Sequence, residues 1–412
     1  MIKGHPNGLI VASIANMGER FGFYTMMAIL VLFLQAKYGL SEETAGDIYS
    51  WFYFFIYGLA LVGGLIADYT KKYKTIIFVG IAVMLVGYVL MSLPIKELTI
   101  TLIGLGTIAL GNGLFKGNLQ AVVGQMYDNN EYSKNRDSAY MIFYMCINIG
   151  AFFAPFAATG IRNWWLESNG FLHDASLPAL CHAYINGTLQ NAAQLQELAS
   201  KVSLSGAVTD LSSFATNYLN LFGVGYNLAF AIAAVSMVIS MVVYLLFGKL
   251  LPNKEKVVTA KVTSDNKSEP HANRGVITVI TSIALLIITP VIFHFAFDNY
   301  QLGLAVGLFF AFVAWMMLKS SKDEFPRVVS LILVFVVVIF FWMSFHQNGL
   351  TLTFFARDYT VKSVDAFSNL FFTLPSIIAV IIAIAGIIIV LMKSMSGKAK
   401  GIGAVMAVVG AA

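Results

Sequence analysis

Long apolar segments recur along the whole chain, separated by shorter polar stretches. Each segment has about 20 residues or more, the length that an α-helix needs to cross the roughly 30 Å apolar core of a bilayer. We predict ten such spans, at 8–36, 44–68, 75–94, 98–126, 138–161, 225–248, 275–297, 301–319, 326–356 and 367–392, whereas 401–412 is too short to cross. The pattern therefore predicts an all-α membrane protein with about 10 transmembrane helices.

The composition agrees with this prediction and excludes several classes of protein. The chain is 58% hydrophobic and 11% charged, whereas soluble domains have about 25% charged residues. The two cysteines, Cys146 and Cys181, lie in an apolar span and a polar loop, which favours neither a disulfide framework nor a metal site. No nucleophile motif, phosphate loop or dinucleotide fingerprint occurs in its required context. We therefore expect no enzyme activity, no cofactor and no metal.

The distribution of basic residues predicts the orientation of the chain. Of the 26 Lys and Arg residues, 18 fall in loops on one side of the membrane, 6 fall on the other side, and Arg20 and Lys116 lie inside spans. Loops with an excess of Lys and Arg normally face the cytoplasm. This places the N-terminus in the cytoplasm. It also explains the net charge of +5 without a nucleic-acid partner.

Two polar segments interrupt the series of spans. Residues 162–224 are rich in Ser, Asn and Ala and are predicted to lie outside the cell, where the composition favours a solvated insertion over a folded cap. Residues 249–274 are polar and basic, as expected of a cytoplasmic linker between helical bundles. The predicted organisation is an N-terminal six-helix bundle over 1–248, followed by the linker and a second set of helices.

Glu19 and Arg20 are adjacent charges inside the first span. A charge at the centre of a membrane helix costs about 2.5–3.5 kcal/mol even on a lenient scale, which indicates a functional role. Helix geometry places Asn16, Arg20 and Tyr24 on one face and Glu19 about 100° away. We therefore expect Glu19 to pair with Lys116 of the fourth span, leaving Arg20 for a substrate carboxylate. The alternative is an inert structural ion pair.

Further polar side chains occur in the fifth and ninth spans. Tyr144 and Asn148 are four residues apart, so they would either face one cavity or hold two helices together. Trp342 and His346 share a face of the ninth span. Because histidine titrates near neutral pH, His346 is a candidate proton-binding group, although it is equally a candidate for a satisfied core residue.

The end of the second span combines glycines with charges. Gly64, Asp68 and Lys72 belong to a segment in which close-packing glycines precede an acid and a cluster of lysines at the membrane edge. The lysines are typical of a cytoplasmic anchor. An anchor does not account for Asp68.

The order and spacing of these motifs resemble the proton-coupled oligopeptide transporters of the major facilitator superfamily. The segment from Glu19 to Tyr24 resembles E-x-x-E-R-F-x-Y-Y, and Phe115 to Asn118 resembles F-K-P-N. Gly63 to Lys74 is similar to the superfamily's loop motif after its second helix. Phe143 to Gly150 resembles F-Y-x-x-I-N-x-G, and Phe341 to Gly349 resembles F-W-x-x-x-E-Q-x-G.

The resemblance implies a transporter of di- and tripeptides that works by alternating access and is driven by protons. The positions matching the family's peptide contacts are Arg20, Tyr24, Tyr57, Asn148 and Trp342. Glu19 and Lys116 match the pair that couples proton to substrate, and Gly64, Asp68 and Lys72 match a cytoplasmic gate motif.

The same resemblance assigns the later helices and the membrane. Residues 275–319 would be two accessory helices, and 326–412 would be the start of an incomplete C-terminal bundle. The expected location is the bacterial inner membrane, with the oligomeric state left open.

Four positions depart from the family pattern. Asn16 replaces the first Glu, Phe23 a Tyr, Gly117 a Pro, and His346 the acid of the seventh core helix. Our hypothesis is that Glu19 and His346 are the titrating groups. Two other functions remain open: transport of another small anionic or zwitterionic solute, and an inactive truncated membrane fragment.

Overall fold

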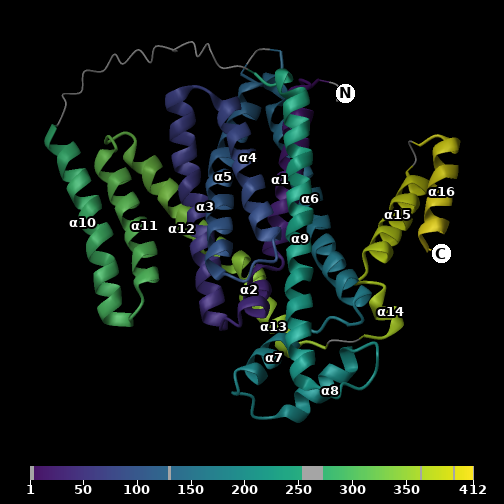
Figure 1. Cartoon of the computed structure of the whole chain (residues 1–412). Coiled ribbons are helices and arrows are strands. Elements are labelled where there is room, and N and C mark those ends of the chain that lie inside the picture. The colour runs from purple at the N-terminus through teal and green to yellow at the C-terminus, as the bar shows by residue number, and fades with distance from the viewer. Residues whose placement is uncertain (1–3, 129–130, 253–271, 362–363, 393–394, 412) are drawn as a thin grey trace. The chain divides into compact units, whose positions relative to one another are not determined.

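The computed structural model describes residues 4–128, 131–252, 272–361, 364–392 and 395–411. Helices dominate this part of the chain (Figure 1). Within it, the strand-like pairing is an isolated antiparallel bridge between Phe171 and Ser203. The predicted all-α class is confirmed.

The N-terminal spans are long helices at the predicted places. They are α3 (Glu42–Thr70), α4 (Tyr73–Ser92), α5 (Leu98–Gln125), α6 (Arg136–Ser168) and α9 (Leu211–Phe247). The first span is broken into α1 (Gly8–Met27) and α2 (Leu30–Tyr38), which meet at 45°. Of the described helices, nine are long and apolar enough to cross a membrane, or ten if the bent pair is one span.

The later helices are α10 (Ala272–Phe297), α11 (Tyr300–Lys319), α12 (Phe325–His346), α13 (Thr351–Tyr359), α14 (Ala366–Asn369), α15 (Leu374–Leu391) and α16 (Gly397–Ala411). The predicted span 326–356 is too long, because a 3-10 turn at Gln347–Gly349 ends α12 and begins a short amphipathic helix. The predicted span 367–392 likewise divides into α14 and α15.

The chain divides into two compact units, which we describe separately. One comprises 1–255 with 349–412, and the other comprises 256–348. Most of the predicted linker 249–274 lies outside the described residues. The domain boundaries proposed from the sequence therefore stay predictions.

Local signals explain where α3 begins and ends. The Ser41 hydroxyl caps its first turn by accepting a hydrogen bond from the Thr44 amide at 3.1 Å, and Glu42 and Glu43 complement the positive end of the helix dipole. At the other end Lys71 adopts a left-handed conformation with φ 56°, and its amide donates to the Ala67 carbonyl. The chain can therefore reverse directly into α4.

Glycines bring α1 into close contact with two neighbours. A Cβ atom at Gly18 would lie 2.3 Å from the Ser240 hydroxyl oxygen of α9. A Cβ atom at Gly150 of α6 would lie 2.6 Å from the Met17 carbonyl oxygen. Small residues permit such approach in membrane helix pairs, where backbone packing replaces the hydrophobic effect. The approach holds α1, which carries Glu19 and Arg20, between α6 and α9.

The predicted solvated insertion at 162–224 is instead folded. The segment continues α6, forms α7 (Leu177–Ile185) and α8 (Ala192–Val202), and then begins α9. Leu177, Cys181 and Leu195 are fully buried. Composition was misleading here because the apolar residues recur at helical spacing and pack beneath a polar surface.

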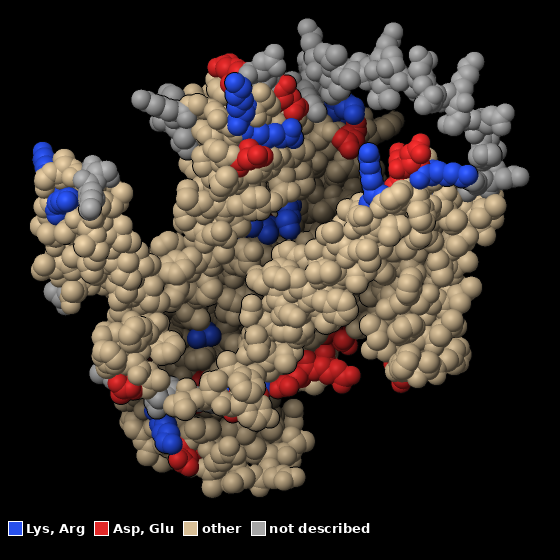
Figure 2. All heavy atoms as spheres, turned by 180° about the vertical axis from the view of Figure 1, so that it is seen from behind, with Lys and Arg blue, Asp and Glu red and all other residues tan. Residues whose placement is uncertain are grey.

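Charged side chains gather near the ends of the helices, and the surfaces between them are almost entirely free of charge (Figure 2). This distribution is the one expected of helices that cross a bilayer.

Candidate functional site

Glu19 and Arg20 form a buried two-point ion pair with each other. Arg20 Nε donates to Glu19 Oε2 at 2.5 Å, and Arg20 Nη2 donates to Glu19 Oε1 at 2.5 Å. Glu19 is fully buried and Arg20 is 5% exposed. The expectation that Arg20 is left without an acidic partner, because Glu19 points about 100° away, is therefore wrong. Both side chains have flexible stems that span the angle between them, and an unpaired charge in this interior would cost several kcal/mol.

Asn112 of α5 completes the shell around the Glu19 carboxylate. Its amide nitrogen donates to Glu19 Oε1 at 2.7 Å, and the residue is fully buried. The Asn112 amide oxygen, the Asn16 amide nitrogen and the Tyr88 hydroxyl are buried without a hydrogen-bond partner among the described residues. Unsatisfied groups of this kind are rare in interiors and often mark functional sites. Sequence reasoning missed Tyr88, whose hydroxyl stands in an otherwise apolar span.

Lys116 does not pair with Glu19, contrary to the prediction. Its ammonium lies over the Tyr57 ring, 4.7 Å from the centroid, and Tyr57 stacks on Tyr53 at 6.2 Å. Lys116 nevertheless interacts electrostatically with both Glu19 and Arg20. A cation over an aromatic face is stabilised by the ring quadrupole without an acid.

Arg20 lies near the two predicted tyrosines. It interacts electrostatically with Tyr24 and Tyr57, and its guanidinium lies over the Phe23 ring at 4.6 Å. Tyr57 is 47% exposed, so it leads from the buried pair to the surface of α3. The structure thus brings Glu19, Arg20, Tyr24, Tyr57 and Lys116 into one neighbourhood, as the sequence predicted, although the pairing differs.

Asn148 and Tyr144 lie on an exposed face of α6. Both line a shallow depression of about 540 Å³ together with Asp137 and Tyr140. Their position on one face of α6 confirms the prediction made from their spacing of four residues. A contact of Asn148 with substrate stays a prediction.

Trp342 and His346 belong to the second unit. Their rings stack with centroids 5.4 Å apart and planes inclined by 23°. The shared helix face is confirmed, and the role of these residues toward Arg20 stays a prediction.

In the predicted gate motif, the glycine that packs closely against α5 is Gly63, whereas the prediction named Gly64. A Cβ atom at Gly63 would lie 2.2 Å from the Gly113 carbonyl oxygen of α5, whereas one at Gly64 would meet nothing within 4 Å. Asn118 Nδ2 also donates to the Gly63 carbonyl at 3.1 Å. Asp68 accepts a hydrogen bond from the Tyr73 hydroxyl at the start of α4, and Lys72 is exposed.

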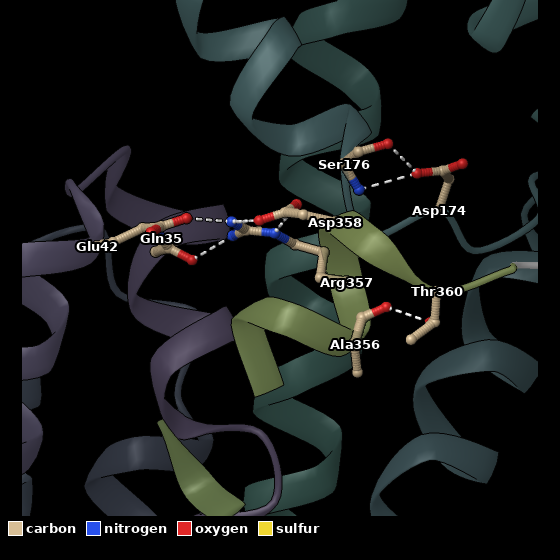
Figure 3. A network of polar contacts seen from close by, with 8 residues as sticks. All are labelled: Gln35, Glu42, Asp174, Ser176, Ala356, Arg357, Asp358 and Thr360. Carbon is tan, nitrogen blue, oxygen red and sulfur yellow. Dashed lines mark hydrogen bonds and ion pairs between the residues drawn. The ribbon is translucent and has the colours of Figure 1, made fainter. Parts of the chain in front are cut away.

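Arg357 forms a polar cluster that sequence reasoning did not single out (Figure 3). From α13 it donates to Gln35 of α2 at 2.7 Å, to Asp358 at 2.7 Å, and to Glu42 of α3. Its side chain is only 12% exposed. The available signal was an arginine at the end of a short segment, 350–356, in which threonines interrupt the apolar residues. The cluster attaches α13 to the ends of α2 and α3.

Comparison with known proteins places the chain in a family. The model of the POT family matches residues 73–399. Residues of the chain are 34% identical over 152 positions to dipeptide and tripeptide permease A of Klebsiella pneumoniae, covering 37% of the chain and 30% of the permease. The Escherichia coli permease of the same name is 32% identical over 152 residues, with the same coverage. The matched region thus spans less than a third of these relatives.

Solved structures support the same fold. A peptide transporter POT mutant in complex with alafosfalin superposes with a TM-score of 0.57 and 21% identity, covering 100% of the chain and 80% of that structure. A POT family transporter in complex with 5-aminolevulinic acid gives 0.56 and 20%, covering 100% and 82%. The fold and the buried charges are those of an α-helical membrane protein. The chain belongs to the POT family.

Proposed function

We propose that the protein carries di- and tripeptides across the membrane by alternating access, in symport with protons. The observation that carries the proposal is the buried guanidinium of Arg20, which donates two hydrogen bonds to the Glu19 carboxylate. Lys116, whose ammonium lies over the Tyr57 ring, belongs to the same neighbourhood. The names of the permease relatives support peptides as the substrate class.

The ion pair suggests how proton and peptide binding are linked. While Glu19 is ionised, its carboxylate occupies the donor fork of Arg20. Protonation of Glu19 would remove that negative charge and leave the fork to the planar carboxylate of a peptide C-terminus, which accepts the same bidentate geometry. Each ligand would then favour the other, because linkage between two binding events is reciprocal.

The remaining members of the site extend this proposal. Tyr24 and Tyr57 would contact the peptide beside Arg20, and Asn148 and Trp342 would contact it from α6 and α12. Lys116 would hold the local potential positive when Glu19 is neutral, since its ammonium interacts electrostatically with both charges of the pair. His346 would be the second proton-binding group.

A second substrate class deserves the same test. Arg20 would suit any small solute that carries a carboxylate, and a POT family transporter has been solved with 5-aminolevulinic acid, a zwitterionic amino acid. Binding of such a solute would use the same competition with Glu19.

We also infer that the protein resides in the bacterial inner membrane with its N-terminus in the cytoplasm. The bacterial relatives and the excess of Lys and Arg in alternate loops support this placement.

Uptake into proteoliposomes tests the proposal. We expect labelled dialanine to accumulate when the lumen is negative and protons flow inward, and to stop accumulating when an ionophore collapses the gradient. Accumulation of 5-aminolevulinic acid alone would favour the second substrate class. Failure to accumulate either solute would contradict the proposed transport activity.

A further inference from the structure

A polar cavity of about 880 Å³ lies apart from the buried ion pair, where the end of α2 meets the α4–α5 connection and the first turns of α9. Its lining includes Lys37, Lys96, Thr216, Asn217, Asn220 and Asn227. None of the residues assigned to peptide or proton binding lines it. The folded cap contributes Ile185 to its wall.

Asn227 is held in one orientation at the base of the cavity. Its amide nitrogen donates to the carbonyl oxygens of Met91, at 2.6 Å, and Leu93, at 3.0 Å. These backbone contacts leave the Asn227 oxygen to face Lys37, whose ammonium donates to it at 3.3 Å. Asn227 is 2% exposed, so the position of this polar group is set before any ligand arrives.

The ammonium group of Lys37 is also held in place by contacts within the protein. The Lys37 ammonium lies over the Phe33 ring at 5.2 Å, and its contact with Asn227 uses one of the three donors that an ammonium carries. Lys96 adds a second positive charge at the exposed edge.

The lining carries more positive than negative charge. Among the described lining residues, Asp210 is the acidic one. Its carboxylate already accepts hydrogen bonds from the backbone amides of Ser212 and Ser213 at the start of α9. Thr216, Asn217 and Asn220 follow at helical spacing on the same wall. Two cations thus line the cavity together with the side-chain amides of Asn217 and Asn220, whereas the Thr216 hydroxyl donates to the Ser212 carbonyl at 3.0 Å.

We propose that this cavity is a binding site for a phosphate-bearing ligand. Lysines act as point charges and are well suited to phosphate, whereas planar carboxylates are matched better by the arginine fork. The side-chain amides of Asn217 and Asn220 add N–H donors for further phosphate oxygens. The phosphate belongs either to a dissolved ester or to a lipid headgroup, and both sources use the same lysines.

Thermal unfolding of the purified protein in dodecyl maltoside micelles, whose detergent carries no phosphate, distinguishes the two sources. Added glycerol 3-phosphate should raise Tm in a saturable manner if the ligand is a dissolved ester. If the ligand is a headgroup, adding phosphatidylglycerol to the micelles should raise Tm instead. Either result supports the site only when it depends on the cavity lysines.

The variants Lys37→Gln and Lys96→Gln test whether the Tm shift depends on the cavity lysines. Each should raise the apparent Kd for the active probe about tenfold, or about 1.4 kcal/mol. The matched control is Lys201→Gln, on the exposed surface of the cap, which should bind as the wild type does. Lys96 lies at the edge, so its variant keeps the test valid if Lys37→Gln folds poorly. Equal Tm shifts in all variants, or no shift with either probe, would overturn the proposal.

Discussion

The guanidinium of Arg20 binds the carboxylate of Glu19, its neighbour in α1, through two hydrogen bonds of 2.5 Å each. Adjacent residues of a helix point in different directions, so this pair forms because both side chains bend toward each other. The amide of Asn112 is a further polar partner of Glu19. The stability of α1 therefore depends on this pair, because each buried charge neutralises the other.

Removing one member of the pair should be more damaging than removing both. Glu19→Gln leaves Arg20 buried without its anion and should lower the free energy of unfolding by about 3–5 kcal/mol. The double variant Glu19→Gln with Arg20→Gln should regain a large part of that loss. Thermal unfolding of the wild type, both single variants and the double variant gives the coupling energy. Additive losses would show that the two groups do not interact.

Glu19→Gln should also abolish proton-driven peptide uptake, because the neutral amide cannot take up or release the coupled proton. Proteoliposome uptake of dialanine measures this effect, with Glu167→Gln, at an exposed position near the end of α6, as the matched control. Accumulation at the wild-type level in Glu19→Gln would refute the assignment of Glu19 to proton coupling.

Two consecutive glycines in α3 should respond oppositely to the same substitution. Gly63→Ala places a methyl group 2.2 Å from the Gly113 carbonyl oxygen and should destabilise the protein by about 1–3 kcal/mol, because α3 and α5 must separate. Gly64→Ala meets nothing within 4 Å and should be neutral or slightly stabilising. Thermal unfolding of the two variants checks the difference. Equal effects would contradict the packing described for α3 and α5.

Arg357→Gln should loosen α13. Arg357 contacts Glu42 and Gln35, but Glu42 is half exposed, so the loss should be only about 0.5–1 kcal/mol. Hydrogen–deuterium exchange of residues 351–359 should quicken a few-fold, since local opening free energy sets the exchange rate. Lys322→Gln, at an exposed position, is the control variant. Phe354 of the same helix packs against the hydrophobic core, and unchanged exchange would show that such apolar contacts alone hold α13 in place.

Cys181 should resist thiol reagents in the folded protein. The side chain is fully buried in α7, and burial raises the pKa of its thiol to about 12, so roughly one thiol in ten thousand is ionised at pH 8. In a Cys146→Ser variant, iodoacetamide should label the protein only after denaturation. Because the pKa is raised, labelling should increase with pH well above 8. Rapid stoichiometric labelling at pH 8 would contradict the folded cap.

His346→Gln should reduce pH-driven uptake several-fold if His346 binds a coupled proton, because glutamine keeps a similar size and polarity without titrating. The matched control is His294→Gln in α10, whose ring stacks on Tyr300. Uptake with an unchanged pH dependence in His346→Gln would exclude this histidine from the proton pathway.

The sequence by itself determined the membrane class and the positions of most helices. About 20 apolar residues are needed per crossing, and this requirement is local to each segment. The same locality explains why Glu19, Arg20 and Lys116 could be recognised as functional, since a charge within an apolar helix is exceptional wherever it is placed. The motif spacings also sufficed to indicate the family.

Only the tertiary structure decided which groups meet. Helix geometry sets the direction of a Cβ atom, but the partner of a long side chain depends on its rotamers and on the helices around it. Glu19 consequently pairs with Arg20, while Lys116 rests on Tyr57. For the same reason Gly63, not Gly64, touches α5, and apolar residues dispersed through 162–224 converge into a folded cap. Apart from the Glu19–Arg20 pair, which forms within one helix, these outcomes rest on contacts between segments distant in the chain, which the spacing along a single helix does not contain.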